Sequence, residues 1–369
     1  MLFPYVFVPH SMDKMQSFIK FIVLDVWCNA ETATPFNLDL FDGNAELRNV
    51  MTSLFHDDTK AGDAFYVHVE SIYNEFALLQ SQQITQFRRW YHANNDIEGA
   101  CTNDPGVQLV RYSDLKQQHP KLSIMLEAFF KGLYSKDLLK LAALKKYIGN
   151  IDDHYEKFRT VNGHNKCPFC GLTDMFGVYH TYREAYDHYL PKSIYPFNSI
   201  NFRNLAPACH HCNSTYKSTA DPAFLPKDKL GVVERRKAFY PYSSDRQPIE
   251  IRVELKTSDV KSMTPVDVGL TFGPASLVEE IDNWRDVYGI DERYKAKCFD
   301  HDAKDWLEEF RILSRTCKMK PKAYLESIQD RVAIDRYANS NFLKKAIIDG
   351  FLRNGALECI AQQHSTDLN

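Results

Sequence analysis

The chain has 369 residues, which is long enough for two domains or for one large domain with an appended module. Its hydrophobic content of 44% and charged content of 25% are those of a globular protein. The sequence contains no long polar tract of the kind that would predict large-scale disorder. The formal net charge of -3 excludes a polycation that binds nucleic acid by counterion release alone, so any contact with nucleic acid must come from a local patch.

The N-terminal sequence MLFPYVFVPHSMDK has no basic region before its short apolar run, and the next apolar run, FIVLDVW, carries Asp25. Neither segment predicts a signal peptide or a membrane span. Five of the nine cysteines are widely scattered, which indicates buried small side chains or free thiols in a reducing compartment, and we expect a cytoplasmic protein. These five are Cys28, Cys101, Cys298, Cys317 and Cys359.

The first part of the chain, residues 1–160, is predicted to form a helical domain. Apolar residues recur there at three- and four-residue spacing, which is the period of an amphipathic helix. The segments with this period are 45–55, 66–92, 122–134 and 136–148. Residues 93–106 cluster Asn, Asp, Gly and Pro and are predicted to be a loop inside this domain.

The rest of the chain divides into a small central domain, 161–226, and a C-terminal domain, 227–369. The central part is rich in Cys, His, Asn and Tyr without helical period, which is typical of a small domain that depends on a metal. In the C-terminal part, residues 249–256 and 266–272 predict two strands by their β-branched content. Helices are predicted at 277–290, 302–315 and 321–354. The fold class is α+β, with helical regions on both sides of a small zinc-bound domain.

Four cysteines form two C-x-x-C pairs, Cys167-Pro-Phe-Cys170 and Cys209-His-His-Cys212. Two such turns can complete a tetrahedral zinc site. Four thiolates close the coordination sphere, so this zinc would be structural and would leave no position for a reacting water. The alternatives are four unrelated thiols or a redox C-x-x-C, and the redox interpretation lacks the βαβ context that it requires.

The 38 residues between the two pairs contain Asp187, His188 and Asn204. Together with the cysteine pairs, the run Asp187-His188-x-x-Pro191-x-Ser193, then Asn204-Leu205 and finally Cys212-Asn213, resembles the HNH endonucleases in their zinc-stapled ββα-metal form. The resemblance covers roughly sixty residues of the chain. The flanking regions match no family by their motifs.

The resemblance implies a role for each of these residues. It implies that Asp187 is a ligand of a catalytic divalent cation, that His188 is the general base, and that the amide of Asn204 pins a loop and orients the base. Asn213 stands where the parent motif has a second histidine, as in the H-N-N variants of the family. An asparagine oxygen suits Mg²⁺ or Mn²⁺. The alternative is that Asn213 caps the helix that begins at the second cysteine pair.

Adjacent side chains on a regular strand point to opposite faces, so Asp187 and His188 can serve one site only if the strand ends or bulges there. Taken alone, His188 could equally be a partly buried histidine satisfied by a backbone carbonyl. Lys192, Arg203 and Lys217 are candidate phosphate contacts, with solvated surface charges as the alternative. The nearby aromatic residues are expected to form the core of the small domain rather than a base-stacking platform. They are Tyr179, Tyr182, Tyr186, Tyr189, Tyr195, Phe197 and Phe202.

The first functional hypothesis is a metal-dependent endonuclease that acts on nucleic acid, most simply DNA, with structural zinc and catalytic Mg²⁺ or Mn²⁺. The resemblance also implies an effector in defence against phages or in restriction, sometimes beside an ATPase partner. A slightly acidic nuclease would need another protein to hold it in check or to bring it to its substrate. The alternative is a non-catalytic, zinc-stabilised module that binds nucleic acid or protein.

Overall fold

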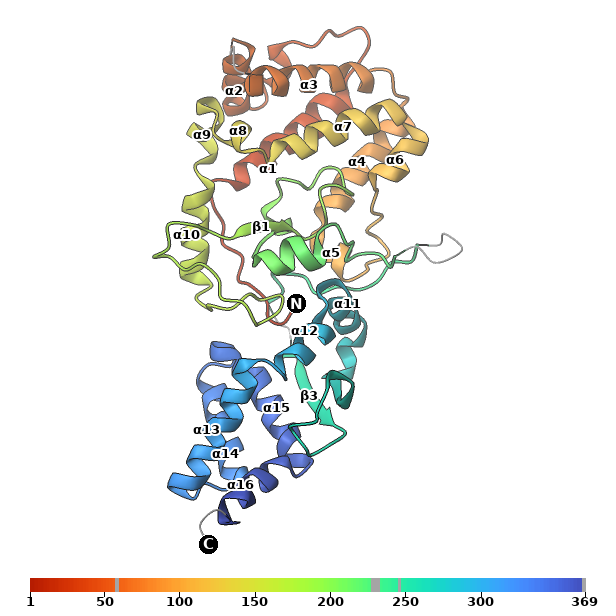
Figure 1. Ribbon diagram of the computed structural model, residues 1–369. Helices are drawn as coiled ribbons and strands as arrows, with labels where there is room; N and C mark the ends of the chain where they lie inside the picture. Colours follow the sequence, from red (N-terminus) through yellow and green to blue (C-terminus); the bar gives the residue numbers. More distant parts are fainter. Residues whose placement is uncertain (57–59, 227–232, 245–246, 367–369) are drawn as a thin grey trace.

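The computed structural model describes residues 1–56, 60–226, 233–244 and 247–366. Figure 1 shows a group of helices at the top, a small sheet with a short helix in the middle, and a second sheet covered by helices at the C-terminal end. This arrangement fits the α+β class. Among the described residues, no helix has both the length and the apolar character that a membrane crossing requires.

The upper helices pack around large apolar side chains. Trp27, Phe41, Phe76, Phe87 and Phe130 are fully buried in this N-terminal core. The helices are α1 (Asp13–Phe21), α2 (Ala45–Phe55), α3 (Lys60–Phe76), α4 (Ser81–Asn95), α5 (Ile97–Cys101), α6 (Tyr112–Gln118), α7 (Pro120–Leu133), α8 (Lys136–Leu139), α9 (Ala142–Ile148) and α10 (Ile151–Val161). Shorter turns are η1 (Ile22–Val26), η2 (Trp27–Asn29) and η3 (Leu38–Phe41).

Three predictions for this region are wrong. The segment 136–148 is divided between α8 and α9. The segment 66–92 is divided between α3 and α4, and the backbone N–H of Gln80 donates to the side chain of Gln83 where α4 begins, at 2.9 Å. The predicted loop 93–106 contains α5, because the carboxylate of Asp96 accepts from the N–H of Gly99 at 2.9 Å and caps a short helix. Asp96, a residue type that also signals a loop in a sequence, thus starts a helix here.

The first residues of the chain also depart from a purely helical domain. Residues 1–9 contain no helix, and Met1, Leu2, Phe3 and Tyr5 are buried in a second core that includes the four paired cysteines. The N–H of Leu2 donates to the carbonyl of Pro168 at 2.6 Å. The N-terminal segment therefore packs against the central cysteine turn, and the ring of Tyr5 also meets that of Phe158 on α10 at 4.7 Å between centroids.

The middle of the molecule holds an antiparallel pair of strands followed by a helix. Strand β1 (Ala185–His188) pairs with β2 (Leu205–Ala208), and η5 (His211–Lys217) follows directly. A short turn, η4 (Phe202–Asn204), precedes β2. The hairpin lies between the two cores: Leu205 belongs to the N-terminal core, and its neighbour Ala206 belongs to the second core.

The C-terminal part contains the two predicted strands, β3 (Glu250–Leu255) and β4 (Val268–Gly273), as an antiparallel pair. Helix α15 (Asn341–Arg353) packs on β3 so closely that a Cβ on Gly350 would lie 2.8 Å from the carbonyl oxygen of Val253. The helices are α11 (Val278–Tyr288), α12 (Ile290–Lys297), α13 (His301–Cys317), α14 (Pro321–Ile334), α15 (Asn341–Arg353) and α16 (Ala356–Thr366). Short turns are η6 (Pro265–Asp267), η7 (Ala275–Leu277) and η8 (Ala338–Ser340).

Candidate functional site

The four paired cysteines come together as the sequence predicts. The sulfur atoms of Cys167, Cys170, Cys209 and Cys212 all lie within 4.8 Å of one another, and all four residues are buried. The first turn closes through a hydrogen bond of 2.7 Å from the N–H of Gly171 to the carbonyl of Cys167. Four convergent sulfur donors fit a metal such as zinc.

The surroundings of this cluster also fit an anionic metal–thiolate group. The guanidinium of Arg293 donates to the sulfur of Cys212 at 3.2 Å and lies over the ring of Tyr216. The backbone N–H of Leu172 donates to the sulfur of Cys170 at 3.4 Å. A cation and a backbone donor directed at sulfur lower the cost of burying thiolate charge. The other five cysteines are free, with Cys317 and Cys359 exposed.

Asp187 points from β1 toward helix η5. Its Oδ1 accepts from the ammonium of Lys217 at 2.9 Å, and that ammonium also donates to the carbonyl of His188 at 2.9 Å. Burial raises the pKa of Asp187, and the contact with Lys217 opposes this shift. The side chain of Lys217 is 0% exposed, so the prediction that Lys217 contacts the phosphate backbone is wrong.

His188 is partly buried and contacts different neighbours. Its Nε2 lies 2.9 Å from the carbonyl oxygen of Ser199, and its ring meets the ring of Tyr134 edge to face at 4.8 Å between centroids. A carbonyl only accepts, so a neutral imidazole must carry its proton on Nε2 and its lone pair on Nδ1. Burial, with the charges of Lys192 and Lys217, lowers the pKa of His188 to about 3.

The strand is regular where these two residues lie, with no bulge in its pairing to β2. Asp187 lies opposite Ala206 and His188 opposite Leu205 in the β1–β2 register. The strand does end at His188, which was the other predicted way for the two side chains to serve one site. In the register observed, their side chains contact different elements, as neighbours on a strand do.

Asn204 holds the loop that follows β1. Its Oδ1 accepts from the N–H of Leu190 at 2.7 Å, and its Nδ2 donates to the carbonyls of Leu190 and Asn198 at 2.9 and 3.4 Å. The residue after Asn198 is Ser199, whose carbonyl meets His188. One fully buried amide thus fixes the loop that orients the imidazole.

Asn213 is the third residue of η5, and the N-cap of that helix is His210. The alternative that Asn213 caps the helix is therefore wrong. Within the described part of the chain, its half-buried side chain has no hydrogen-bond partner. Asp187 Oδ2 is also buried and lacks a protein partner. Buried polar atoms of this kind are usually satisfied by water or an ion. This carboxylate oxygen is a candidate ligand atom for a cation.

The remaining predicted residues have different surroundings. Lys192 is half-buried, and its ammonium lies 5.3 Å from the centre of the Tyr134 ring that also contacts His188. Arg203 is exposed and lies over the ring of Phe7. Of the aromatic residues predicted to form the core, five are buried and two are exposed, Tyr179 (100%) and Tyr182 (75%). The five buried ones are Tyr186, Tyr189, Tyr195, Phe197 and Phe202.

Sequence reasoning missed three neighbours of the site. Tyr134 comes from the end of the upper helices, Ser199 from the loop, and Arg293 from α12. The sequence around Tyr134 carried only the signal of an amphipathic helix, and Ser199 acts through its backbone. The tertiary fold alone brings these residues to the site.

Comparison with known proteins finds partial relatives. No family model matches the chain, and no solved structure matches it. A stretch of 112 residues, 29% of the chain, is 31% identical to Protein ea31 of Escherichia phage lambda and covers 32% of that protein. A stretch of 107 residues, 28% of the chain, is 31% identical to the Septu protein PtuB of Bacillus thuringiensis and covers 35% of it. The similarity thus spans about a third of these relatives.

Proposed function

We propose that this chain is a metal-dependent endonuclease of the HNH type, most simply acting on DNA, in which His188 is the general base. The observation that carries the proposal is the path from Asn204 through the pinned loop to the Ser199 carbonyl and His188. This path fixes one tautomer of a neutral imidazole at the end of a strand. A rigidly held base of this kind is what water activation requires.

The chemistry follows from the tautomer. With Nε2–H donating to Ser199, Nδ1 of His188 accepts a proton from a water that attacks the phosphorus of a phosphodiester. A pKa of about 3 keeps the imidazole neutral, and a phosphate anion beside it would raise that pKa toward a more effective value. Mg²⁺ or Mn²⁺ held by Asp187 and Asn213 would stabilise the charge that develops on the phosphate and the leaving oxygen.

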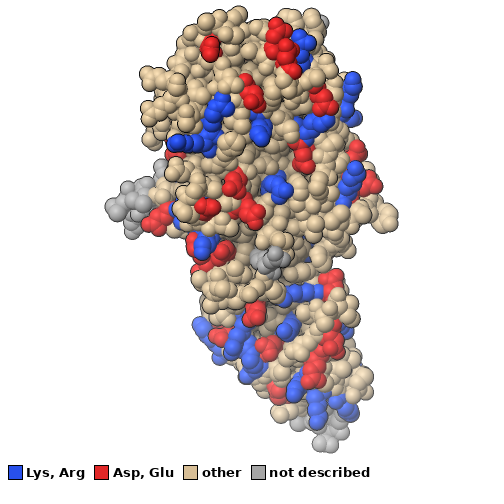
Figure 2. Space-filling view, turned by 180° about the vertical axis from the view of Figure 1, so that it is seen from behind, with Lys and Arg blue, Asp and Glu red and all other residues tan. Residues whose placement is uncertain are grey.

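A role in defence against phages is part of the proposal. The similarity to a Septu protein, PtuB, is compatible with such a role. Figure 2 shows basic and acidic residues interspersed along the face that it draws, without a broad basic band among the described residues there. A surface of this kind attracts DNA weakly. A protein partner, for example an ATPase, would then bring the nuclease to its substrate.

One observation favours a second candidate function, a zinc-stabilised module that binds nucleic acid or protein without cutting. The ammonium of Lys217 already neutralises Asp187, so the carboxylate is satisfied in part without a divalent cation. If this ion pair persists with substrate present, Asp187 is structural. The two candidates differ in whether His188 is needed for a chemical step.

A cleavage assay separates them. The purified chain is incubated with supercoiled plasmid and, separately, with RNA, in Mg²⁺, Mn²⁺ or chelator. We expect cation-dependent cleavage that His188→Ala slows by at least about 10²-fold, because a general base contributes that much or more. His301→Ala is the matched control, since His301 is 90% exposed on α13. Cleavage by His188→Ala at the wild-type rate would place any nuclease site elsewhere, and binding without cleavage would favour the second candidate.

A further inference from the structure

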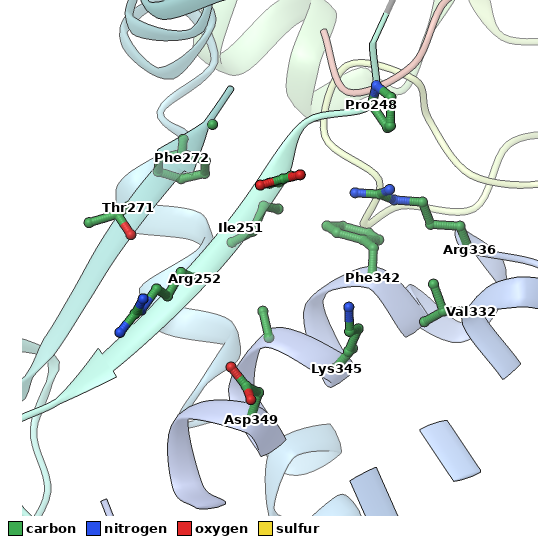
Figure 3. A pocket seen from close by; sticks show the side chains of 13 residues that line it. Pro248, Ile251, Arg252, Thr271, Phe272, Val332, Arg336, Phe342, Lys345 and Asp349 are labelled. Carbon is green, nitrogen blue, oxygen red and sulfur yellow. The ribbon is translucent and has the colours of Figure 1, made fainter. Parts of the chain in front are cut away.

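A cavity lies in the C-terminal part of the molecule, outside the hairpin. It has a volume of about 600 Å³ and is bounded by β3, β4, α14 and α15. Figure 3 shows Arg336, Phe342 and Lys345 extending from the helical side toward Ile251 on β3. The volume is in the range of sites for small molecules.

The charges that line this cavity do not cancel. Among the acidic and basic lining residues, Arg252 pairs with Glu254 at 3.3 Å and Asp349 pairs with Arg353 at 3.0 Å, so each of these is neutralised nearby. The other lining charges are two cations, Arg336 and Lys345, and one carboxylate, Glu250.

Both cations are available to a ligand. Within the described residues, Lys345 has no ion-pair partner, and the guanidinium of Arg336 donates only to the carbonyl of Ile249. The Nε of Arg336 is buried without an acceptor. Buried N–H groups without partners are uncommon and often mark the position of an absent ligand or water. An anionic group between Arg336 and Lys345 would satisfy both cations with charge-assisted hydrogen bonds.

The other walls are apolar or hydroxylic. Ile251, Val332, Phe342 and Ala346 line the same space, and Phe342 presents an aromatic ring. Such walls favour a flat apolar body attached to the anionic group. Glu250 can accept hydrogen bonds from hydroxyl or amino groups of that body.

We propose that this cavity binds a nucleoside phosphate, with its phosphate at Arg336 and Lys345, its base along Phe342 and Ile251, and its hydroxyl or amino groups at Glu250. Inorganic phosphate alone would leave the apolar walls unused, and a nucleoside alone would leave the two cations unpaired. Both the phosphate and the nucleoside of the ligand therefore contribute to binding.

The cavity wall is connected to the cysteine cluster. A Cβ on Gly171, the residue after Cys170, would lie 2.7 Å from the ring of Phe342, so the ring rests on that turn. The hydroxyl of Ser340 donates to the carbonyl of Gly171 at 3.4 Å. A nucleotide held against Phe342 thus stabilises the element that supports the cysteine turn, whatever reaction the hairpin performs.

Isothermal titration of the full chain tests the proposal directly. The ligands are AMP, GMP, CMP and UMP, with the four nucleosides and inorganic phosphate titrated separately. We expect saturable binding of at least one mononucleotide, and affinities for its nucleoside and for phosphate that are lower by about tenfold or more. Lys345→Met should weaken this binding by about tenfold or more, because it removes one of two charges at the phosphate.

Lys322→Met is the matched control, since Lys322 is exposed on α14 outside the cavity lining, and it should bind as the wild type does. Lys345→Gln gives a second, polar replacement if the methionine variant does not fold. Absence of binding for all four mononucleotides at about 1 mM would overturn the proposal. Equal affinity for phosphate and mononucleotide, or equal affinity in wild type and both Lys345 variants, would overturn it as well. All of these results are independent of nuclease activity.

Discussion

At the scale of single residues, the proposed function makes Asn213 a ligand of the cation. Because it lies inside η5 rather than at its cap, Asn213→Ala should cost less than about 1 kcal/mol of stability. If its amide oxygen binds the cation, the same change should raise the Mg²⁺ concentration for half-maximal cleavage by about tenfold or more. Metal titrations of plasmid cleavage measure this effect.

The partner substitution Asn213→His places an imidazole at the same position and should shift the preference toward Ni²⁺, Co²⁺ or Zn²⁺. An Asn213→Ala protein that is less stable but keeps the wild-type Mg²⁺ dependence would show that the residue is structural and not a ligand.

His154 makes the stability of the molecule depend on pH, and it does so beside strand β1. It is 2% exposed, and its Nδ1 shares a hydrogen bond with the hydroxyl of Tyr186. Burial is the main cause that lowers the pKa of His154 to about 4, and the charge of the nearby His10 lowers it further. As pH falls below the ordinary pKa of about 6.5, His154 becomes protonated in the unfolded chain but stays neutral in the folded chain. The folded state therefore loses stability relative to the unfolded state.

The expected loss from His154 is about 2 kcal/mol of unfolding free energy between pH 8 and pH 5. His154→Gln should be less stable at pH 8 but should lose less stability on acidification. Urea unfolding at both pH values measures the difference. His301→Gln, at an exposed histidine, should follow the wild type. A wild-type pH dependence in His154→Gln would mean that His154 titrates normally in the folded state.

At the scale of elements, the two cysteine turns should bind metal as a unit. Cys212→Ser removes one of four convergent sulfurs and should abolish tight metal binding, with a loss of several kcal/mol, because structural zinc contributes about 10 kcal/mol or more in small zinc modules. Metal content by mass spectrometry and thermal unfolding report both effects. Cys298→Ser, at a buried cysteine outside the cluster, should keep its metal. Unchanged metal content in Cys212→Ser would contradict the site.

Some of these elements could be predicted from the sequence, and others could not. Element β3 and the cysteine cluster were predictable because alternation and C-x-x-C spacing are local signals. The break between α3 and α4 was not, because apolar periodicity continues across the turn at 77–80. In the site, the roles of His188 and Asn204 were implied by the family resemblance, and the hydrogen bonds of Asn204 fit a residue that holds a loop. The sequence could not place Lys217 against Asp187, since a buried ion pair between residues thirty positions apart has no local pattern.

At the scale of the whole molecule, the cysteine turn joins segments from both ends of the chain. The hydroxyl of Tyr294 donates to the carbonyl of Cys170 at 2.8 Å, and the indole N–H of Trp284 donates to the carbonyl of Phe169 at 2.6 Å. At Gly171, a Cβ would lie 2.4 Å from Leu2 as well as against the C-terminal helices. The second core therefore depends on this turn, while the N-terminal core is built from other residues.

Removal of metal should consequently loosen the second core and leave the N-terminal core unchanged. After chelation, we expect faster amide hydrogen exchange in residues 1–8, in the turn 167–171 and in α11, α12 and α15, because these segments pack on the turn. Exchange in α2, α4 and α7 should change little, because their buried side chains lie in the N-terminal core. Exchange followed by mass spectrometry resolves these segments, and the metal-depleted protein with zinc restored is the control. Equal acceleration in α7 and α15 would mean that the two cores unfold as one cooperative unit.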